Sequence, residues 1–174
     1  MVPEVRISTE NAQLLREEPA EALEDLFAAI QDEGMELALT SAYRPMTNSW
    51  RSTGTAMRSR HRAADEGMAR PGYSEHQTGL AADVISIDNP ECIHGDCFAD
   101  TPEGQWVAQH AHEFGFIIRY PEGAEEITGY QYEPWHLRYV GEDTAAEVFE
   151  EDLTLEEYWE QAPAAEYDEP EPDL

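Results

Sequence analysis

The chain has 174 residues, of which 41% are hydrophobic, and this length and composition suit one domain of ordinary size with a real core. Its 38 acidic residues outnumber its 10 basic residues, all of them arginine, and the formal net charge at pH 7 is −28. A field of that sign repels nucleic-acid phosphates and anionic lipid head groups, so we expect no nucleic-acid partner. No apolar run approaches the ~20 residues that span a bilayer, and we expect no transmembrane segment in this chain.

The charge is distributed unevenly along the chain. Residues 44–70 contain six arginines and two acids, whereas residues 142–174 contain fourteen acids and no base. The final stretch, QAPAAEYDEPEPDL, is rich in proline and acids, which is typical of a disordered tail. We therefore predict one domain over residues 1–160 and an acidic tail over residues 161–174.

Hydrophobic spacing in the first half predicts a helix followed by a strand. Apolar residues recur at helical spacing over residues 20–33, and Gly34 follows as a C-terminal cap. Residues 35–41 alternate between apolar and polar or small side chains, as a half-buried strand does. Because this strand ends before a proline, Arg44 is predicted to lie at its exit. The arginine-rich residues 47–69 predict a further helix.

The second half predicts three strands with helices between and after them. The strands are expected over residues 81–87, 116–119 and 135–140. Thr101 and Pro102 open a helix that ends before Gly115, and a final helical region begins near residue 144. Thr154 and Glu157 form a capping-box pattern within it. Strands and helices do not alternate regularly, which favours an α+β fold with a central, mainly antiparallel sheet flanked by helices.

Two cysteines, Cys92 and Cys97, flank four loop residues that include His94. Their spacing allows a small disulfide hairpin, a pair of reduced thiols, or a metal site that His94 joins. A disulfide would indicate an oxidising, extracytoplasmic setting.

The residues that suggest chemistry lie in three short segments: SAYRP (41–45), YSEHQTGLAAD (73–83) and EPWHLRYVG (133–141). His76, Asp83 and His136 supply two imidazoles and one carboxylate, a set that holds a catalytic Zn²⁺ and leaves one position open. The same set also suits non-haem iron. Alternatively, His76 and Asp83 are hydrogen-bonded partners that cap a loop.

Two further residues are candidates for catalysis. Glu133 precedes a proline and lies three residues before His136, so its carboxylate can face a metal-bound water without binding the metal. Arg44 is a cation available to a developing oxyanion. Alternatively, Glu133 is one exposed acid among many, and Arg44 forms a surface ion pair.

The motifs S-x-Y-R, S-x-H-x6-D and E-P-W-H-x-R-Y-V-G, in this order, resemble those of zinc D-alanyl-D-alanine carboxypeptidases of the VanY type. That family belongs with lysostaphin-like peptidases and the hedgehog domain, and the likeness covers residues 37–141. It implies a hedgehog/DD-peptidase-like fold, one Zn²⁺ per chain, and removal of the terminal D-alanine from peptidoglycan stem peptides. It also implies the zinc ligands His76, Asp83 and His136, the catalytic base Glu133, and Arg44 as the group that polarises the scissile carbonyl.

The resemblance also implies residues that bind the substrate. Ser74 matches a serine that helps to hold the terminal carboxylate, and Trp135 matches a wall of the D-alanine methyl pocket. Tyr43 and Gln77 are weaker candidates for substrate contact. The likeness implies a bacterial protein that faces the cell wall, with any leader or anchor outside this sequence.

Several alternatives stay open. The same scaffold is also compatible with three other functions: an L,D-carboxypeptidase, a peptidoglycan endopeptidase, and a peptidoglycan-binding module without turnover. Arg119 and Arg138, near strand ends, either pair with acids or contact the glycan.

Overall fold

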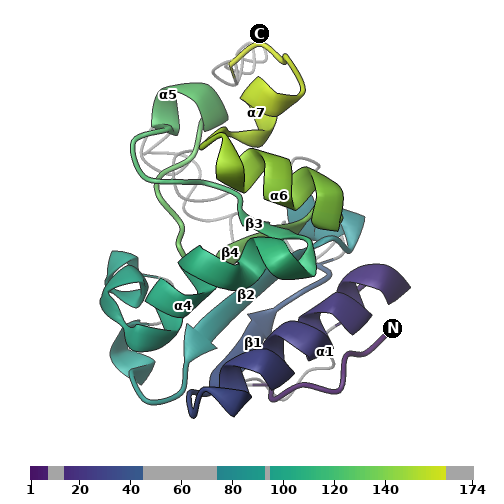
Figure 1. Ribbon diagram of the computed structural model, residues 1–174, viewed down its shortest axis with the longest axis vertical. Helices are drawn as coiled ribbons and strands as arrows, with labels where there is room; N and C mark the ends of the chain where they lie inside the picture. The colour runs from purple at the N-terminus through teal and green to yellow at the C-terminus, as the bar shows by residue number, and fades with distance from the viewer. Residues whose placement is uncertain (8–13, 45–73, 93–94, 164–174) are drawn as a thin grey trace, which may run out of the picture.

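The computed structural model describes residues 1–7, 14–44, 74–92 and 95–163 (Figure 1). The predicted helix over residues 47–69 and most of the predicted tail lie outside these residues. The elements in chain order are α1 (Glu17–Asp32), β1 (Leu37–Ser41), η1 (Glu75–Thr78), β2 (Ala81–Ser86), η2 (Pro90–Cys92), η3 (Asp96–Asp100), α4 (Pro102–His110), η4 (Ala111–Phe114), β3 (Phe116–Ile118), α5 (Glu125–Thr128), β4 (His136–Tyr139), α6 (Glu142–Glu150) and α7 (Leu155–Tyr158).

The four strands form one sheet in the order β1-β2-β4-β3, and every neighbouring pair is antiparallel. This topology confirms the predicted α+β class with a mainly antiparallel sheet. The two central strands are far apart in sequence, and their register places Asp83 opposite His136 and Ala81 opposite Arg138. Residues directly opposite each other in such a pair project from the same face of the sheet.

One face of the sheet carries the main apolar core. Figure 1 shows α1 and α4 lying across the strands, and their apolar residues join those of the sheet in a single buried cluster. Because side chains alternate along a strand, Ala82 and Val84 of β2 and Leu137 of β4 point into this core. Asp83 and His136 are the sequence neighbours of these core residues and therefore project to the opposite face.

The helix that follows Thr101 begins as predicted and ends earlier. The Thr101 hydroxyl accepts a hydrogen bond of 3.0 Å from the Gly104 amide, which caps α4. After His110 the chain tightens into the 3₁₀ helix η4, and Gly115 ends it with a φ of 77°. A side chain at Gly115 would place its Cβ 2.8 Å from the Tyr139 ring, so both the backbone angle and the space require glycine here.

The predicted C-terminal helical region forms α6 and α7. The capping box is confirmed, because Thr154 and Glu157 each accept a hydrogen bond from the other's backbone amide. Leu155 and α6 residues pack against Ile117 of β3 in a second, smaller apolar cluster. Among the described residues, no helix is long and apolar enough to cross a membrane.

Cys92 and Cys97 form a disulfide, with their Cα atoms 5.4 Å apart. Of the three alternatives that the spacing left open, the structure selects the hairpin. The bond joins η2 to η3 directly before α4.

Candidate active site

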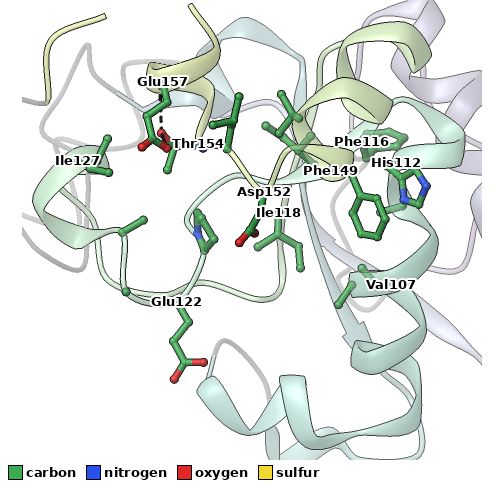
Figure 2. A pocket seen from close by; sticks show the side chains of 18 residues that line it. Val107, His112, Phe116, Ile118, Glu122, Ile127, Phe149, Asp152, Thr154 and Glu157 are labelled. Carbon is green, nitrogen blue, oxygen red and sulfur yellow. Dashed lines mark hydrogen bonds between the residues drawn. The ribbon is translucent and has the colours of Figure 1, made fainter. Parts of the chain in front are cut away.

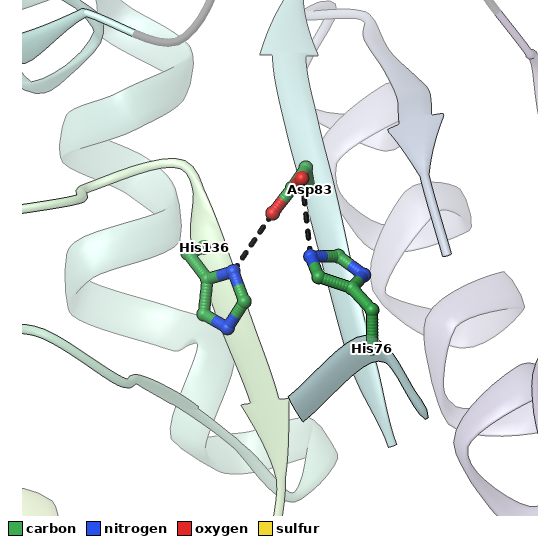
Figure 3. Close-up of side chains that lie close together, drawn as sticks. All are labelled: His76, Asp83 and His136. Atoms are coloured by element: carbon green, nitrogen blue, oxygen red, sulfur yellow. Dashed lines mark hydrogen bonds and ion pairs between the residues drawn. The ribbon is translucent and has the colours of Figure 1, made fainter. Parts of the chain in front are cut away.

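Three buried side chains converge on the face of the sheet opposite the main core (Figure 3). His76 comes from η1, Asp83 from β2 and His136 from β4, and one ligand atom from each lies within 4.8 Å of the others. Their residues are only 1%, 4% and 4% exposed, respectively. The three predicted metal ligands are therefore brought together by the fold.

Local structure sets the direction of each of the three side chains. Asp83 and His136 are cross-strand partners, so the sheet register alone places them side by side. Nδ1 of His76 donates a hydrogen bond of 2.6 Å to the carbonyl oxygen of Ala42, just beyond β1. Since a carbonyl can only accept, the proton lies on Nδ1, and Nε2 carries the lone pair that faces Asp83.

Asp83 lies between the two imidazoles. Its Oδ1 is 2.8 Å from Nδ1 of His136, and its Oδ2 is 3.2 Å from Nε2 of His76. Nε2 of His76 is nevertheless buried without a hydrogen-bond partner among the described residues. Two buried ring nitrogens and one buried carboxylate converge here. They form a donor set that fits a divalent metal with an open coordination position.

The charges of the three groups are strongly coupled. Burial opposes ionisation of Asp83, yet the neighbouring His76 and His136 hold its pKa well below the usual range. Burial also opposes protonation of His136, but its hydrogen bond to Asp83 and the nearby negative charge of Glu75 raise its pKa to about 9. Burial lowers the pKa of His76, and Asp83 offsets this only in part. Metal binding at such a site releases protons from the ligands, so metal affinity there depends on pH.

Glu133 lies beside this group. Its Oε2 is 3.8 Å from Nδ1 of His136, on the side of the ring that faces Asp83. The Glu133 amide donates to the Tyr120 carbonyl at 3.0 Å, and the His136 amide donates to the Glu133 carbonyl at 3.0 Å. Burial, with the nearby carboxylates of Asp83 and Glu75, raises the pKa of Glu133 to about 7, although His136 and Arg44 oppose the shift. A carboxylate of this kind is suited to exchange protons near neutral pH.

Arg44 approaches the same group from the exit of β1. Its Nη2 is 3.6 Å from Asp83 Oδ2, and its backbone amide donates to the His76 carbonyl at 3.3 Å. The Arg44 side chain is 54% exposed, so its guanidinium can also reach a molecule that enters from solvent.

Comparison with known proteins identifies the family of this chain. The sequence profile of the VanY family, described as D-alanyl-D-alanine carboxypeptidase, matches residues 12–142. The chain belongs to the VanY family. The Bacillus subtilis (strain 168) protein YodJ is 44% identical to this VanY-family chain over 164 residues, which are 92% of this chain and 60% of YodJ. The chain thus spans less than two thirds of that relative.

Solved structures of similar proteins share the fold. The LdcB LD-carboxypeptidase is 43% identical with a TM-score of 0.84, and the match covers 93% of the VanY-family chain and 77% of LdcB. VanYB in complex with D-alanine-D-alanine is 30% identical with a TM-score of 0.73, over 90% of this chain and 89% of VanYB. A VanY mutant from a VanB-type resistance cassette, in complex with Zn(II), is 31% identical with a TM-score of 0.70 over the same shares.

The four predicted substrate-binding residues differ in their exposure to solvent. Ser74 and Gln77 are half-buried at the start of η1 and within it, and Tyr43 is exposed. Trp135 is half-buried and packs against the main core of the VanY-family domain. The roles of these four residues toward a substrate stay predictions.

Sequence analysis missed Glu75, although it lies between Ser74 and His76. Its Oε1 accepts a hydrogen bond of 2.8 Å from Arg119 and forms an ion pair with Arg138 at 2.8 Å, so both arginines pair with an acid. Burial opposes ionisation of Glu75, but His136 and the two arginines hold its pKa well below the usual range. Spacing could not reveal this contact, because Arg119 directly follows β3 and Arg138 lies on β4, both far from Glu75 in the sequence. Tyr120, which stacks on the His136 ring with centroids 5.1 Å apart, was missed for the same reason.

A second concave region lies away from the three ligands. This pocket of about 340 Å³ is enclosed by α4, η4, β3, the α5 loop, α6 and the approach to α7 (Figure 2). Apolar side chains such as Val107, Phe116 and Ile118 line it, and Glu122, Asp152 and Glu157 are the acids along it. None of the candidate site residues of this VanY-family chain is among its lining.

Proposed function

We propose that this protein is a zinc-dependent D-alanyl-D-alanine carboxypeptidase that removes the terminal D-alanine from peptidoglycan stem peptides. The observation that carries the proposal is the convergence of His76, Asp83 and His136, with Glu133 and Arg44 beside them. Membership of the VanY family supports the reaction, and VanYB in complex with D-alanine-D-alanine supports the substrate class.

His76, Asp83 and His136 would hold one Zn²⁺, through Nε2, a carboxylate oxygen and Nδ1. The VanY structure in complex with Zn(II) supports the choice of metal. Zinc in such a site supplies Lewis-acid polarisation of a carbonyl and lowers the pKa of a water molecule toward ~7. With three protein ligands, one position is left for solvent or substrate.

Glu133 is the base in this proposal. Its Oε2 takes a proton from the attacking water and returns it to the nitrogen of the departing D-alanine, so the carboxylate is regenerated in each cycle. The raised pKa of Glu133, about 7, brings its proton affinity close to neutral pH and suits both halves of this transfer. Burial excludes competing solvent from the carboxylate and thereby strengthens its interactions with the reacting groups.

Arg44 and the substrate-binding residues complete the proposal. The exposed guanidinium of Arg44 donates hydrogen bonds to the scissile carbonyl oxygen as negative charge develops on it. Ser74 helps to hold the terminal carboxylate, Trp135 forms a wall for the D-alanine methyl group, and Tyr43 and Gln77 extend the contact surface. Fixing the carboxylate makes the enzyme an exopeptidase, because an internal residue offers no such group.

A second candidate function is L,D-carboxypeptidase activity, in which the scissile bond joins an L-configured centre of the preceding residue to the last D-alanine. The similarity to the LdcB LD-carboxypeptidase, with a TM-score of 0.84, favours it. Both reactions would use the same ligands, base and cation, so they differ in the pocket that receives the penultimate residue.

Defined substrates separate these functions. Purified protein is loaded with one equivalent of Zn²⁺ and incubated with a stem pentapeptide ending in D-Ala-D-Ala, the corresponding tetrapeptide and a cross-linked dimer, and the products are identified by mass spectrometry. The proposal expects loss of one D-alanine from the pentapeptide. Faster cleavage of the tetrapeptide would support the L,D function, cleavage of the dimer an endopeptidase, and binding without cleavage a peptidoglycan-binding module.

The proposed substrate also sets the location of the protein. Peptidoglycan stem peptides lie outside the cytoplasmic membrane, so we propose that the protein works at the bacterial cell wall. The disulfide between Cys92 and Cys97 supports this, because such bonds persist in oxidising compartments.

A further inference from the structure

The two ring nitrogens of His136 face two different carboxylates. Nδ1 lies 2.8 Å from Asp83 Oδ1 and 3.8 Å from Glu133 Oε2, whereas Nε2 lies 3.7 Å from Glu75 Oε2. Asp83 belongs to the three converging ligands, and Glu75 lies outside them, behind the ring. One edge of the imidazole is therefore directed at the metal position and the other at Glu75.

The two atoms of the rear contact are both buried and otherwise unpartnered. Among the described residues, neither Nε2 of His136 nor Oε2 of Glu75 has a hydrogen-bond partner. A buried donor or acceptor that makes no hydrogen bond destabilises the fold, because it has lost its hydrogen bonds to water without replacing them. A small approach of the two groups that converts this contact into a hydrogen bond is therefore favourable, and no other described group competes for either atom.

Two arginines fix the orientation of Glu75. Its Oε1 accepts a hydrogen bond from Nε of Arg119 and forms an ion pair with Nη1 of Arg138, each at 2.8 Å. Arg138 lies on β4, two residues after His136. Arg119 is held in addition by a bidentate ion pair with Glu156 of α7. With Oε1 held from two directions, the carboxylate cannot rotate freely, and Oε2 stays directed at the His136 ring.

We propose that Glu75 is a positioning residue that selects the metal-binding nitrogen of His136. Its Oε2 accepts the hydrogen of Nε2, so the neutral ring keeps its lone pair on Nδ1, directed at the metal position. A neutral imidazole carries only one N–H, and the partner of one nitrogen decides the state of the other. The negative charge behind the ring also makes Nδ1 a stronger ligand. This inference rests on the metal centre of the proposed function and adds a residue to it.

The first test measures zinc affinity by competition with a chromophoric chelator. Glu75→Gln keeps the size of the side chain and removes its charge, and we expect zinc affinity to fall about 10- to 100-fold. Glu156→Gln is the matched control, because it removes the other partner of Arg119 and leaves the contact between Glu75 and His136 in place. We expect its zinc affinity to stay close to that of the unaltered protein. Equal losses in both variants, or no loss in Glu75→Gln, would overturn the proposal.

The second test needs no variant. In ¹⁵N-labelled, zinc-loaded protein, long-range ¹H–¹⁵N spectra of His136 should show a hydrogen on Nε2 and none on Nδ1. Zinc on Nε2 with the hydrogen on Nδ1 would overturn the assignment. Neither measurement uses D-alanine release, so protein that binds zinc in the stated way but cleaves no stem peptide would refute the proposed activity and leave the role of Glu75 intact.

Discussion

The two faces of the central sheet bury neighbouring residues for opposite reasons. Val84 and Leu137 are fully buried against α1 and α4, while Asp83 and His136, next to them in sequence, are 4% exposed on the other face. Burial of the first pair is favourable by itself, since it removes apolar area from water. Burial of the second pair is costly unless partners compensate for the lost hydration.

Burial alone therefore does not distinguish a scaffold residue from a site residue. On the core face, each side chain needs only a well-packed neighbour. On the other face, His136 is contacted by Asp83, Glu75, Glu133 and the Tyr120 ring. We infer that the stability of the domain resides chiefly in the first face and its activity in the second, and this separation can be tested.

The largest expected effect is on turnover. Glu133→Gln removes the proposed base without touching the three ligands, and we expect kcat to fall about 10²- to 10⁴-fold while bound zinc stays stoichiometric. His136→Ala should lose both activity and zinc. Metal analysis and D-alanine release on the same samples check both statements. A Glu133→Gln enzyme with normal turnover would remove the carboxylate from the mechanism.

On the core face, the expected effect is on stability. Leu137→Ala empties space behind the site and should lower the free energy of unfolding by about 2–5 kcal/mol. Thermal and urea unfolding measure this loss, and Glu133→Gln, on the other face, should unfold close to the unaltered protein. Well below its melting temperature, the folded Leu137→Ala protein should retain stoichiometric zinc. If it loses zinc while still folded, the two faces are not separable.

A pH profile sharpens the role of the site face. A base acts when deprotonated, so kcat/KM should fall as the pH drops below the pKa of Glu133, which burial raises to about 7. A bound cation favours the carboxylate, which places the acid limb at or below that value. The limb should approach a tenfold loss per pH unit, measured with initial rates between about pH 8 and pH 5. Glu133→Gln should lack this limb, and its persistence in that variant would assign the limb to another group.

The smallest expected effect concerns α7, which carries Glu156 toward Arg119. Thr154→Ala removes the cap of α7 and should cost about 1 kcal/mol, whereas Thr154→Ser, which keeps the hydroxyl, should cost less. Hydrogen bonds from Thr154 lower the pKa of Glu157 from 4.5, so the Glu157 half of the box stabilises the fold above that pH and is lost as the pH falls through the lowered pKa. The Thr154→Ala deficit in thermal unfolding should therefore shrink on acidification. A constant deficit would exclude Glu157 as the partner.

Much of the fold and of the candidate site could be predicted before the structure. Period-two alternation predicted β1, the buried strand predicted over residues 81–87 contains β2, and the Thr-Pro and Thr-x-x-Glu patterns predicted the starts of α4 and α7. The early end of α4 was not predicted, because Ala111 and Phe114 continue the helical pattern into η4. The motifs predicted that His76, Asp83 and His136 share one site, and the structure brings the three side chains together. Their role as metal ligands stays a prediction.

The choices that sequence analysis left open were decided by contacts between distant segments. Arg119 and Arg138 could have faced either acids or a glycan, and the sheet brings both to Glu75. Cys92 and Cys97 were compatible with thiols, metal or a disulfide, and the fold shows the bond.

The class of fold, the strongly acidic character and the set of side chains able to bind a metal can be inferred from the amino-acid sequence, because periodicity, charge and residue type are local properties. Three facts follow only from the assembled fold: Asp83 pairs with His136 across two strands, Nδ1 of that ring faces Asp83, and Nε2 faces Glu75. These facts depend on strand register and on arginines from separate elements, and such long-range geometry is set only when the whole sheet is assembled.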